Sequence, residues 1–92
     1  MEKNVRKELD TLRTMVLNWK RSYLSYATPE GDDGFLADEF SEEISRHVSP
    51  LIRRLFETRY LSHSEACEFL DYCYAQVEEV RILVSETEEK QG

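Results

Sequence analysis

The chain has 92 residues, of which 40% are hydrophobic and 34% are charged, and its formal net charge is −7. This length supports a single domain, because a second hydrophobic core would not fit. The acidic balance argues against direct binding of nucleic acid, which needs a basic face. No apolar run approaches the roughly 20 residues of a membrane span, and the start of the chain lacks the apolar core of a secretory signal. We therefore expect a cytoplasmic protein that contacts neither nucleic acid nor membrane.

The first expected helix covers residues 2–27. Its apolar residues recur at alternating intervals of four and three, which is the spacing of one continuous stripe along a helix. These residues are Val5, Leu9, Leu12, Val16, Trp19, Tyr23 and Tyr26. The helix ends before Pro29, because the residue that precedes a proline is biased away from helix. Residues 29–34 then form a turn that contains two glycines and two aspartates.

The middle expected helix covers residues 35–48 and continues over residues 50–60. In its first part, Leu36, Phe40, Ile44 and Val48 recur at intervals of four. Pro50 removes a helical N–H group and clashes with the carbonyl group four residues before it. The sequence therefore predicts that this helix is either kinked or split at Pro50.

The last expected helix covers residues 64–87, and a frayed polar tail follows over residues 88–92. Ser62 and Glu65 match a capping box, in which each side chain bonds to the backbone N–H group of the other residue. The apolar stripe of this helix consists of Ala66, Leu70, Cys73, Val77, Val80 and Val84. Three segments of similar length predict an all-α fold, an antiparallel up-down three-helix bundle. The alternative is a four-helix arrangement in which residues 50–60 form a separate short helix.

The two cysteines, Cys67 and Cys73, lie six positions apart on the last expected helix. The helix turns their side chains about 120° apart and separates them by roughly 9 Å along its axis. This geometry is poor for a disulfide. We expect two reduced thiols, with Cys73 in the core and Cys67 partly exposed.

Charge is distributed unevenly along the chain. Residues 28–45 contain seven acidic and no basic residues, and residues 61–92 contain eight acidic residues against two basic ones. In an antiparallel bundle this distribution places a strongly acidic end opposite an end that is nearly neutral. One interpretation is that opposite charges on adjacent helices select their pairing and keep the surface hydrated. The other interpretation is that the acidic end docks a basic partner.

Four acidic residues form two pairs with the same spacing, Glu39 with Glu42 and Glu68 with Asp71. This pattern resembles the ExxE…ExxD motif of the all-α nucleotide pyrophosphohydrolases. The resemblance implies four carboxylates that hold Mg²⁺ for attack on a nucleoside triphosphate. In the expected hairpin, however, Glu42 and Glu68 lie roughly 18 Å apart along the bundle, whereas the ligands of one ion all lie about 2 Å from it.

Two helical trios offer other combinations of metal-binding side chains. Glu39, Glu43 and His47 share one helical face, and so do His63, Cys67 and Asp71. Neither trio has the repeated Cys and His pairs of a structural zinc site. We therefore expect no catalytic residue, no metal and no cofactor, and the Mg²⁺-dependent nucleotide hydrolase is kept as a remote alternative.

Apolar residues outside the stripes are the most informative feature for function. Leu17, Leu24 and Ile82 fall at outward heptad positions near the acidic end, and Tyr72 adds an aromatic side chain on an outer position. Such a cluster on a small bundle indicates a surface for self-association or for a partner. We expect a small, non-catalytic protein–protein interaction module, such as an adaptor, regulator or binding chaperone, that uses these four residues.

The alternative function depends on charge. An acidic inhibitor, of the immunity type or a nucleic-acid mimic, would block a basic partner by presenting Glu39, Glu42 and Glu43 together. Both functions imply a protein partner, and both are compatible with a homodimer.

Overall fold

The computed structural model describes residues 2–26 and 35–89, and in this part of the chain 91% of the residues are helical and none is in a strand. The helices are α1 (Lys3–Tyr26), α2 (Phe35–His47), α3 (Ser49–Glu57) and α4 (His63–Glu89). The all-α prediction is confirmed. The predicted turn at residues 29–34 lies outside the described residues, and so do residues 90–92 of the predicted tail. None of the four helices is both long and apolar enough to cross a membrane.

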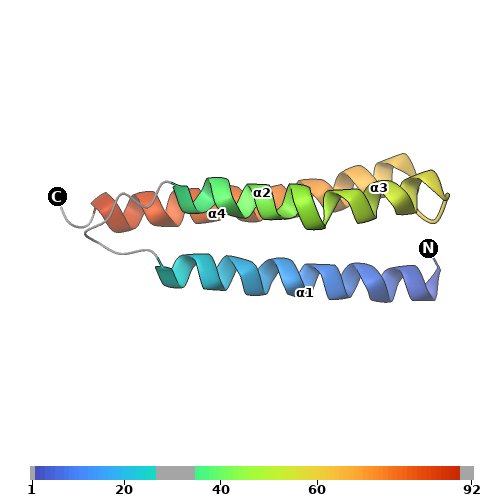
Figure 1. Cartoon of the computed structure of the whole chain (residues 1–92), viewed down its shortest axis with the longest axis horizontal. Coiled ribbons are helices and arrows are strands. Elements are labelled where there is room, and N and C mark those ends of the chain that lie inside the picture. Colours follow the sequence, from blue (N-terminus) through green and yellow to red (C-terminus); the bar gives the residue numbers. More distant parts are fainter. Residues whose placement is uncertain (1, 27–34, 90–92) are drawn as a thin grey trace.

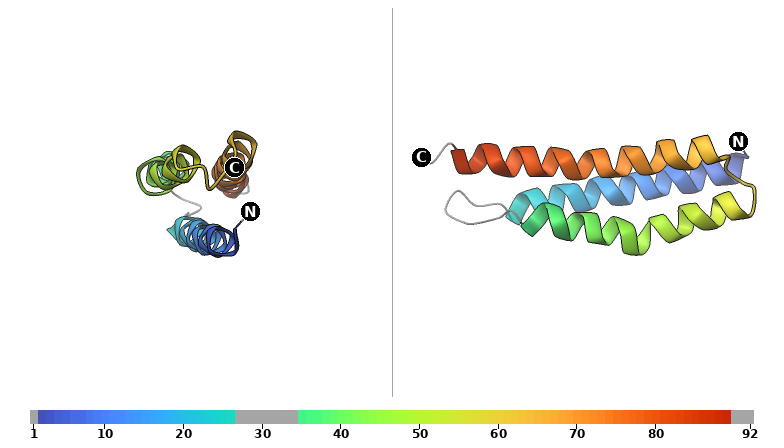
Figure 2. Two further views of the ribbon diagram at one scale, coloured as in Figure 1. Left: turned by 90° about the vertical axis from the view of Figure 1, so that its right-hand side faces the viewer. Right: turned by 90° about the horizontal axis from the view of Figure 1, so that it is seen from above.

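The helices form an elongated rod that measures 50 × 18 × 17 Å. The chain runs along α1, returns along α2 and α3, and then runs along α4 in the direction of α1 (Figure 1). Seen from one end, α1, the α2–α3 pair and α4 occupy the corners of a triangle (Figure 2). This arrangement is consistent with a three-helix bundle, in which the middle helix is kinked.

The kink in the middle helix lies at Val48, where α2 ends and α3 begins. The Val48 N–H group donates to the Ile44 carbonyl at 2.9 Å, and the Ile52 N–H group donates to the Val48 carbonyl at 3.1 Å. Helical hydrogen bonding therefore continues across the junction. Pro50 has no N–H group to donate to the Arg46 carbonyl, and its ring crowds that carbonyl. The result is one bent helix, which the right-hand view of Figure 2 shows.

The end of α3 differs from the prediction, which extended this helix to Tyr60. Arg59 has a φ of 67°, in the left-handed region, and the helix ends at Glu57. The Tyr60 N–H group donates to the Leu55 carbonyl at 2.8 Å, and the Arg59 N–H group donates to the Phe56 carbonyl at 3.0 Å. These two bonds define a Schellman motif, whose left-handed position is usually glycine. The prediction was wrong because arginine gives no sequence signal for this conformation.

The capping box at the start of α4 is confirmed. The Ser62 N–H group donates to a carboxylate oxygen of Glu65 at 2.8 Å, and the Glu65 N–H group donates to the Ser62 hydroxyl at 3.1 Å. At its other end, α4 continues through residues 88 and 89, which the sequence assigns to the frayed tail.

The core runs along the rod between the three helical segments. In α4, Phe69 is buried, whereas Leu70 of the predicted stripe is only half-buried. In α1, the predicted stripe leaves the core near its end, because Tyr26 is 68% exposed. The buried apolar residues are Val5, Leu9, Leu12, Val16, Leu36, Ala37, Phe40, Ile44, Val48, Ile52, Leu61, Ala66, Phe69, Cys73, Val77, Val80 and Val84.

Polar contacts between the helices fix their alignment along the rod. The Lys20 ammonium group of α1 donates to Gln76 Oε1 at 3.0 Å and to Glu79 Oε2 at 2.6 Å, both on α4. The hydroxyl groups of Ser45 and Tyr74 lie 2.7 Å apart and link α2 to α4. Because Gln76 is buried, its bond to Lys20 removes the cost of an unpaired amide oxygen.

Candidate functional site

The four residues of the predicted apolar surface differ in their exposure. Ile82 is 55% exposed and Leu17 is 39% exposed, as expected for outward positions. Leu24 and Tyr72, by contrast, are half-buried and pack against the core, so the prediction that they point outward was wrong. A straight helix drifts by about 20° per seven residues, and this drift turns Leu24 toward the bundle relative to Leu17. Ile82 borders a shallow depression with Arg81, Ser85 and Glu86, all on α4, so Leu17 of α1 is not part of it.

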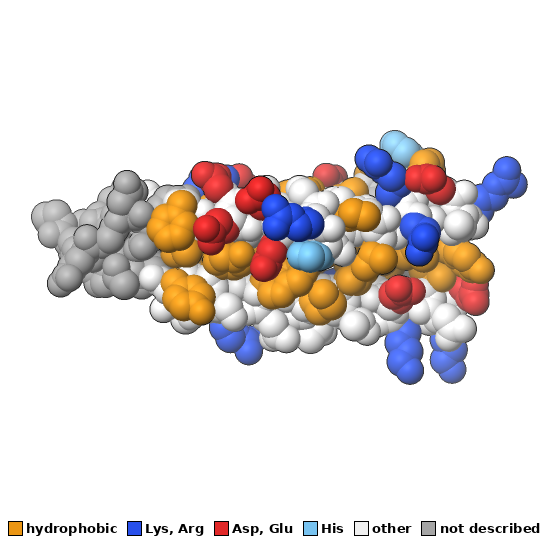
Figure 3. Space-filling view, viewed as in Figure 1, with side chains coloured by type: hydrophobic (Ala, Val, Ile, Leu, Met, Phe, Trp, Pro, Cys, Tyr) orange, Lys and Arg blue, Asp and Glu red, His pale blue; other side chains and the backbone are white. Residues whose placement is uncertain are grey.

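A groove between α1 and α2 combines aromatic and acidic side chains, and we call it the α1–α2 groove. Its volume is about 300 Å³. It is lined by Trp19, Ser22, Tyr23, Tyr26, Glu39 and Glu43. The three aromatic residues are spaced by four and three on α1, and the two glutamates by four on α2, so each set shares one helical face. Figure 3 shows hydrophobic side chains along this side of the molecule, with acidic side chains beside them near the grey residues.

Tyr23 connects the groove to the core. Its ring stacks on Phe40, with the ring centroids 5.4 Å apart. Burial raises the pKa of Tyr23 above 10.0, and the carboxylates of Glu43 and Glu39 raise it further, as does a hydrogen bond from the tyrosine hydroxyl to Glu43. A phenol is harder to ionise next to negative charge. Burial is the largest cause of this pKa shift, and the charges of Glu43 and Glu39 act on the phenol in the same direction.

Further aromatic side chains, those of His47 and Phe35, lie near the residues at the two ends of the groove. At the inner end, Trp19 is half-buried and its ring lies 6.2 Å from the ring of His47. At the outer end, Tyr26 is 68% exposed. Phe35 is 52% exposed and precedes Glu39 by one turn of α2. Large aromatic side chains are enriched in surfaces that bind another protein.

No arginine or lysine in the described part of the chain forms an ion pair with Glu39 or Glu43. The third glutamate of the predicted acidic row is different, because Glu42 pairs with Arg46 at 3.4 Å. Nearby cations also have other partners: Arg81 lies 3.6 Å from Asp38. Glu39 is exposed and Glu43 is half-buried, so both carboxylates can be reached from solvent. Their charges are therefore available to a ligand.

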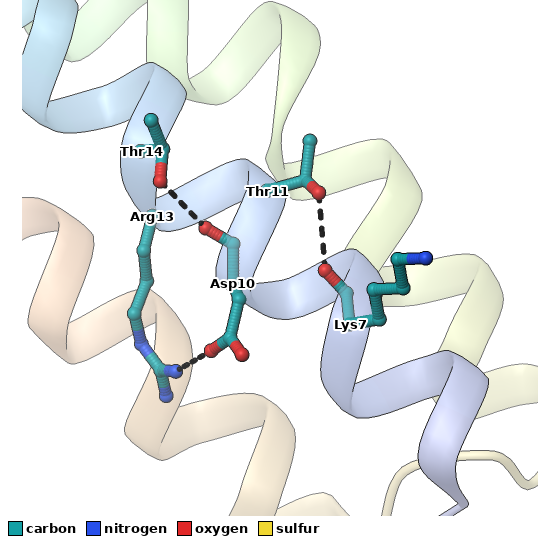
Figure 4. Close-up of polar contacts among 5 residues, drawn as sticks. All are labelled: Lys7, Asp10, Thr11, Arg13 and Thr14. Atoms are coloured by element: carbon teal, nitrogen blue, oxygen red, sulfur yellow. Dashed lines mark hydrogen bonds and ion pairs between the residues drawn. The ribbon is translucent and has the colours of Figure 1, made fainter.

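A second groove, between α1 and α4, contains a cation of the chain itself. The Arg13 guanidinium carbon lies 5.4 Å from the centre of the Phe69 ring and 5.8 Å from that of Tyr72. The guanidinium group also donates to Asp10 at 2.9 Å (Figure 4). An arginine between aromatic faces and a carboxylate is thus an arrangement that this protein already forms. Neither this contact nor the α1–α2 groove was predicted from the sequence.

The basic residues at the other end of the rod line a different depression. It lies at the bend between α2 and α3 and includes Ser45, Ser49, Arg53 and Arg54. Residues 2–13 and 49–71 together contain seven basic and seven acidic residues, so this end of the molecule has no net charge. The rest of the described chain, residues 14–26, 35–48 and 72–89, contains nine acidic and four basic residues, so the described part of the molecule is more acidic toward the end that contains the α1–α2 groove.

The carboxylates of the hydrolase-like pattern do not form a metal site. Glu39, Glu42, Glu68 and Asp71 are all exposed. Within residues 2–26 and 35–89, no three His, Cys, Asp or Glu side chains come together as ligands for one ion. The Cys67 sulfur lies 3.7 Å from Nε2 of His63, but Asp71 does not complete this pair to a site. The resemblance to the nucleotide pyrophosphohydrolases thus rests on spacing alone.

The cysteines behave as the sequence predicts. Both are free, Cys67 is exposed and Cys73 is buried. Burial raises the pKa of Cys73 to about 11. A buried thiol with a high pKa is a packing group rather than a nucleophile.

Comparison with known proteins finds no family model, no curated protein and no solved structure that matches this chain. The function is therefore proposed from the residues of the α1–α2 groove and from the charge around it.

Proposed function

We propose that this chain is a small, non-catalytic interaction module that binds a basic segment of a partner protein. The observation that supports this proposal most strongly is the α1–α2 groove, where Tyr26 is 68% exposed beside two carboxylates that pair with no lysine or arginine in the described part of the chain. Binding a basic segment would cover the aromatic surface and neutralise Glu39 and Glu43 in one step. Aromatic anchors surrounded by polar groups carry much of the energy of protein interfaces.

The distribution of acidic residues in the sequence supports a basic partner rather than a neutral one. Residues 28–45 contain seven acidic residues and no basic one, and they include both glutamates of the groove. The opposite end of the rod has no net charge. A partner with a basic surface would therefore be oriented toward the groove before contact, and its association rate would fall as salt is added. Two free cysteines fit a reducing, cytoplasm-like compartment, which we propose as the place where the module works.

A charge-dominated version of the same function is the acidic inhibitor, which would block a basic cleft mainly with Glu39, Glu42 and Glu43. In the version dominated by apolar contacts, Leu17 and Ile82 carry more of the binding. Glu42 already pairs with Arg46, so the three carboxylates are not equivalent. The acidic inhibitor, which needs all three, is therefore less well supported than binding in the groove. A homodimer is a third version, in which the groove end of one copy lies on the neutral end of another.

Affinity capture from the source lysate, at low and at high salt, tests these versions. We expect one basic protein to be retained at low salt and released at high salt. Neutralising Glu39, Glu42 and Glu43 to glutamine would abolish its capture if charge dominates, whereas Leu17→Asp with Ile82→Asp would do so if apolar contacts dominate. The control with the same change in net charge is Glu57→Gln, Glu68→Gln and Asp71→Asn at the neutral end. A chain that stays monomeric in sedimentation equilibrium and captures no protein would count against the proposal.

A further inference from the structure

We propose that the α1–α2 groove holds the guanidinium group of an arginine side chain from the partner. This inference rests on the proposed function, because it names the chemical group by which the basic segment is recognised. The side chains that hold the arginine are the ring of Tyr26 and the carboxylates of Glu39 and Glu43, and Trp19 lines the same groove further in.

The spacing of the groove residues fits this group. Glu39 and Glu43 are one turn apart on α2, so their Cβ atoms are separated by about 6 Å. A guanidinium group has five N–H donors in a plane, so it can bond to carboxylates with its edges while its face lies on an aromatic ring. The aromatic rings project from α1, on the opposite wall of the groove. The two walls thus supply the two kinds of contact that a planar cation makes.

The same contacts occur inside the protein at Arg13. Its guanidinium group lies over the rings of Phe69 and Tyr72 and donates to Asp10, as described above. In that groove the arginine and its carboxylate come from α1 and the rings from α4. In the α1–α2 groove the rings come from α1 and the carboxylates from α2, and no described arginine or lysine pairs with these carboxylates.

Arginine is expected to bind better than lysine. An ammonium group is a compact and strongly hydrated charge, which cannot stack on a ring and loses more hydration on entering a groove. The hydroxyl of Tyr23 already donates to Glu43, so an arriving cation can share that carboxylate and take Glu39 entirely. A guanidinium group can bond to both carboxylates with its edges while its face lies on an aromatic ring, and an ammonium group has no flat face for the second contact.

The fluorescence of Trp19 gives a direct measurement, because the chain has one tryptophan and it lines the groove. The probe is a blocked tetra-arginine peptide, titrated into the full-length protein at about 0.1 M salt, where charges more than about 10 Å apart are largely screened. We expect a saturable change in fluorescence. Tetra-lysine should bind at least about threefold more weakly. A blocked tetra-glutamate peptide should give no change.

Two double variants with the same change in net charge distinguish binding in the groove from non-specific electrostatic attraction between the peptide and the acidic protein. Glu39→Gln with Glu43→Gln should raise the Kd for tetra-arginine by about tenfold, because both carboxylate contacts are lost. Glu68→Gln with Asp71→Asn, at the far end of the 50 Å rod, should change it by less than about twofold. Tyr26→Ala should weaken binding by about fivefold through the loss of a cation–π contact. Circular dichroism checks that each variant is folded.

Three results would overturn the site: no saturable signal with tetra-arginine, equal losses in the two double variants, or equal binding of tetra-lysine and tetra-arginine. Failure of tetra-arginine to bind rejects the arginine site even if a partner is captured from the lysate. Saturable tetra-arginine binding that needs Glu39 and Glu43 supports the arginine site even if no partner is captured from the lysate. A failure to capture a partner counts against the proposed function alone.

Discussion

The ring of Tyr23 stacks on the ring of Phe40 with the two centroids 5.4 Å apart, so the same residue contributes to the core and to the α1–α2 groove. Phe40 is fully buried, whereas the hydroxyl of Tyr23 bonds to Glu43. This position links the ionisation of Tyr23 both to folding and to the charges of the groove.

Neutralising the groove should therefore lower the pKa of Tyr23. Burial is the main reason that this pKa lies above 10.0, and Glu43 and Glu39 contribute next. In the double variant Glu39→Gln with Glu43→Gln, the pKa should move back toward 10.0 without reaching it. The measurement is the ultraviolet absorbance of phenolate against pH, with the variant Tyr23→Phe subtracted to isolate this residue from the other tyrosines. An unchanged titration curve would contradict the effect of these two charges on the phenol.

The same pKa predicts the effect of alkaline pH on stability. Because the pKa of Tyr23 is higher in the folded state, the folded protein keeps this proton at a pH where the unfolded chain loses it. The stabilising effect is complete below pH 10.0 and is lost as the pH rises through the folded-state pKa. Urea unfolding between pH 10.0 and the folded-state pKa should thus show a steeper loss of stability in the natural protein than in Tyr23→Phe.

The capping box predicts a loss of stability when Ser62 is replaced. Ser62→Ala should lower the free energy of unfolding by about 1 kcal/mol, because it removes the bond to the Glu65 N–H group. The N–H group of Ser62 and then its hydroxyl lower the pKa of Glu65, so the stabilisation contributed by the Glu65 carboxylate is present above pH 4.5 and fades as the pH falls through the folded-state pKa. Ser64→Ala, two residues into the capped end of α4, is the control and should change stability much less. Equal effects of both changes in urea unfolding would refute the cap.

Arg59 predicts a stabilising substitution. Its φ of 67° is unfavourable for a residue with a Cβ atom, and Arg59→Gly should raise the free energy of unfolding by up to about 1 kcal/mol. The control is Arg54→Gly inside α3, where glycine should destabilise by about 1 kcal/mol. Both effects can be read from thermal unfolding curves. A destabilised Arg59→Gly variant would show that the arginine side chain has a contact that outweighs its backbone strain.

The two cysteines should differ in reactivity. Cys67 is exposed, whereas Cys73 is buried and has a pKa of about 11. Iodoacetamide at neutral pH should therefore modify Cys67 alone in the folded protein and both residues in urea, which mass spectrometry of the digested protein measures. Modification of Cys73 at the same rate as Cys67 in the folded protein would contradict the burial of this thiol.

The parts of the fold that the sequence predicts well are those with a local physical cause. The spacing of apolar residues predicts the helices, Pro50 predicts the disturbance of the middle helix, and Ser62 with Glu65 predicts the start of α4. Each of these signals involves residues within one or two turns of each other.

The features that were missed depend on contacts between helices or on a rare backbone conformation. Leu24 was assigned to the surface because its heptad position matches that of Leu17, yet Leu24 is half-buried and packs against the core. Tyr72 is covered because Arg13 lies over its ring, and this contact joins residues that are far apart in sequence. The α1–α2 groove likewise needs the alignment of Tyr23 with Glu43, which no spacing within a single helix reveals.

The elongated shape of the rod affects how its gel-filtration elution volume should be interpreted. The radius of gyration is 15.1 Å, whereas a compact domain of this length would have about 12 Å. An elongated particle diffuses more slowly than a sphere of equal mass. A monomer of 10.9 kDa would therefore elute early from a gel-filtration column calibrated with globular standards, at a volume that suggests a larger species. From the elution volume alone, a monomer would thus be mistaken for an oligomer. Its mass must be measured by a method that does not depend on shape.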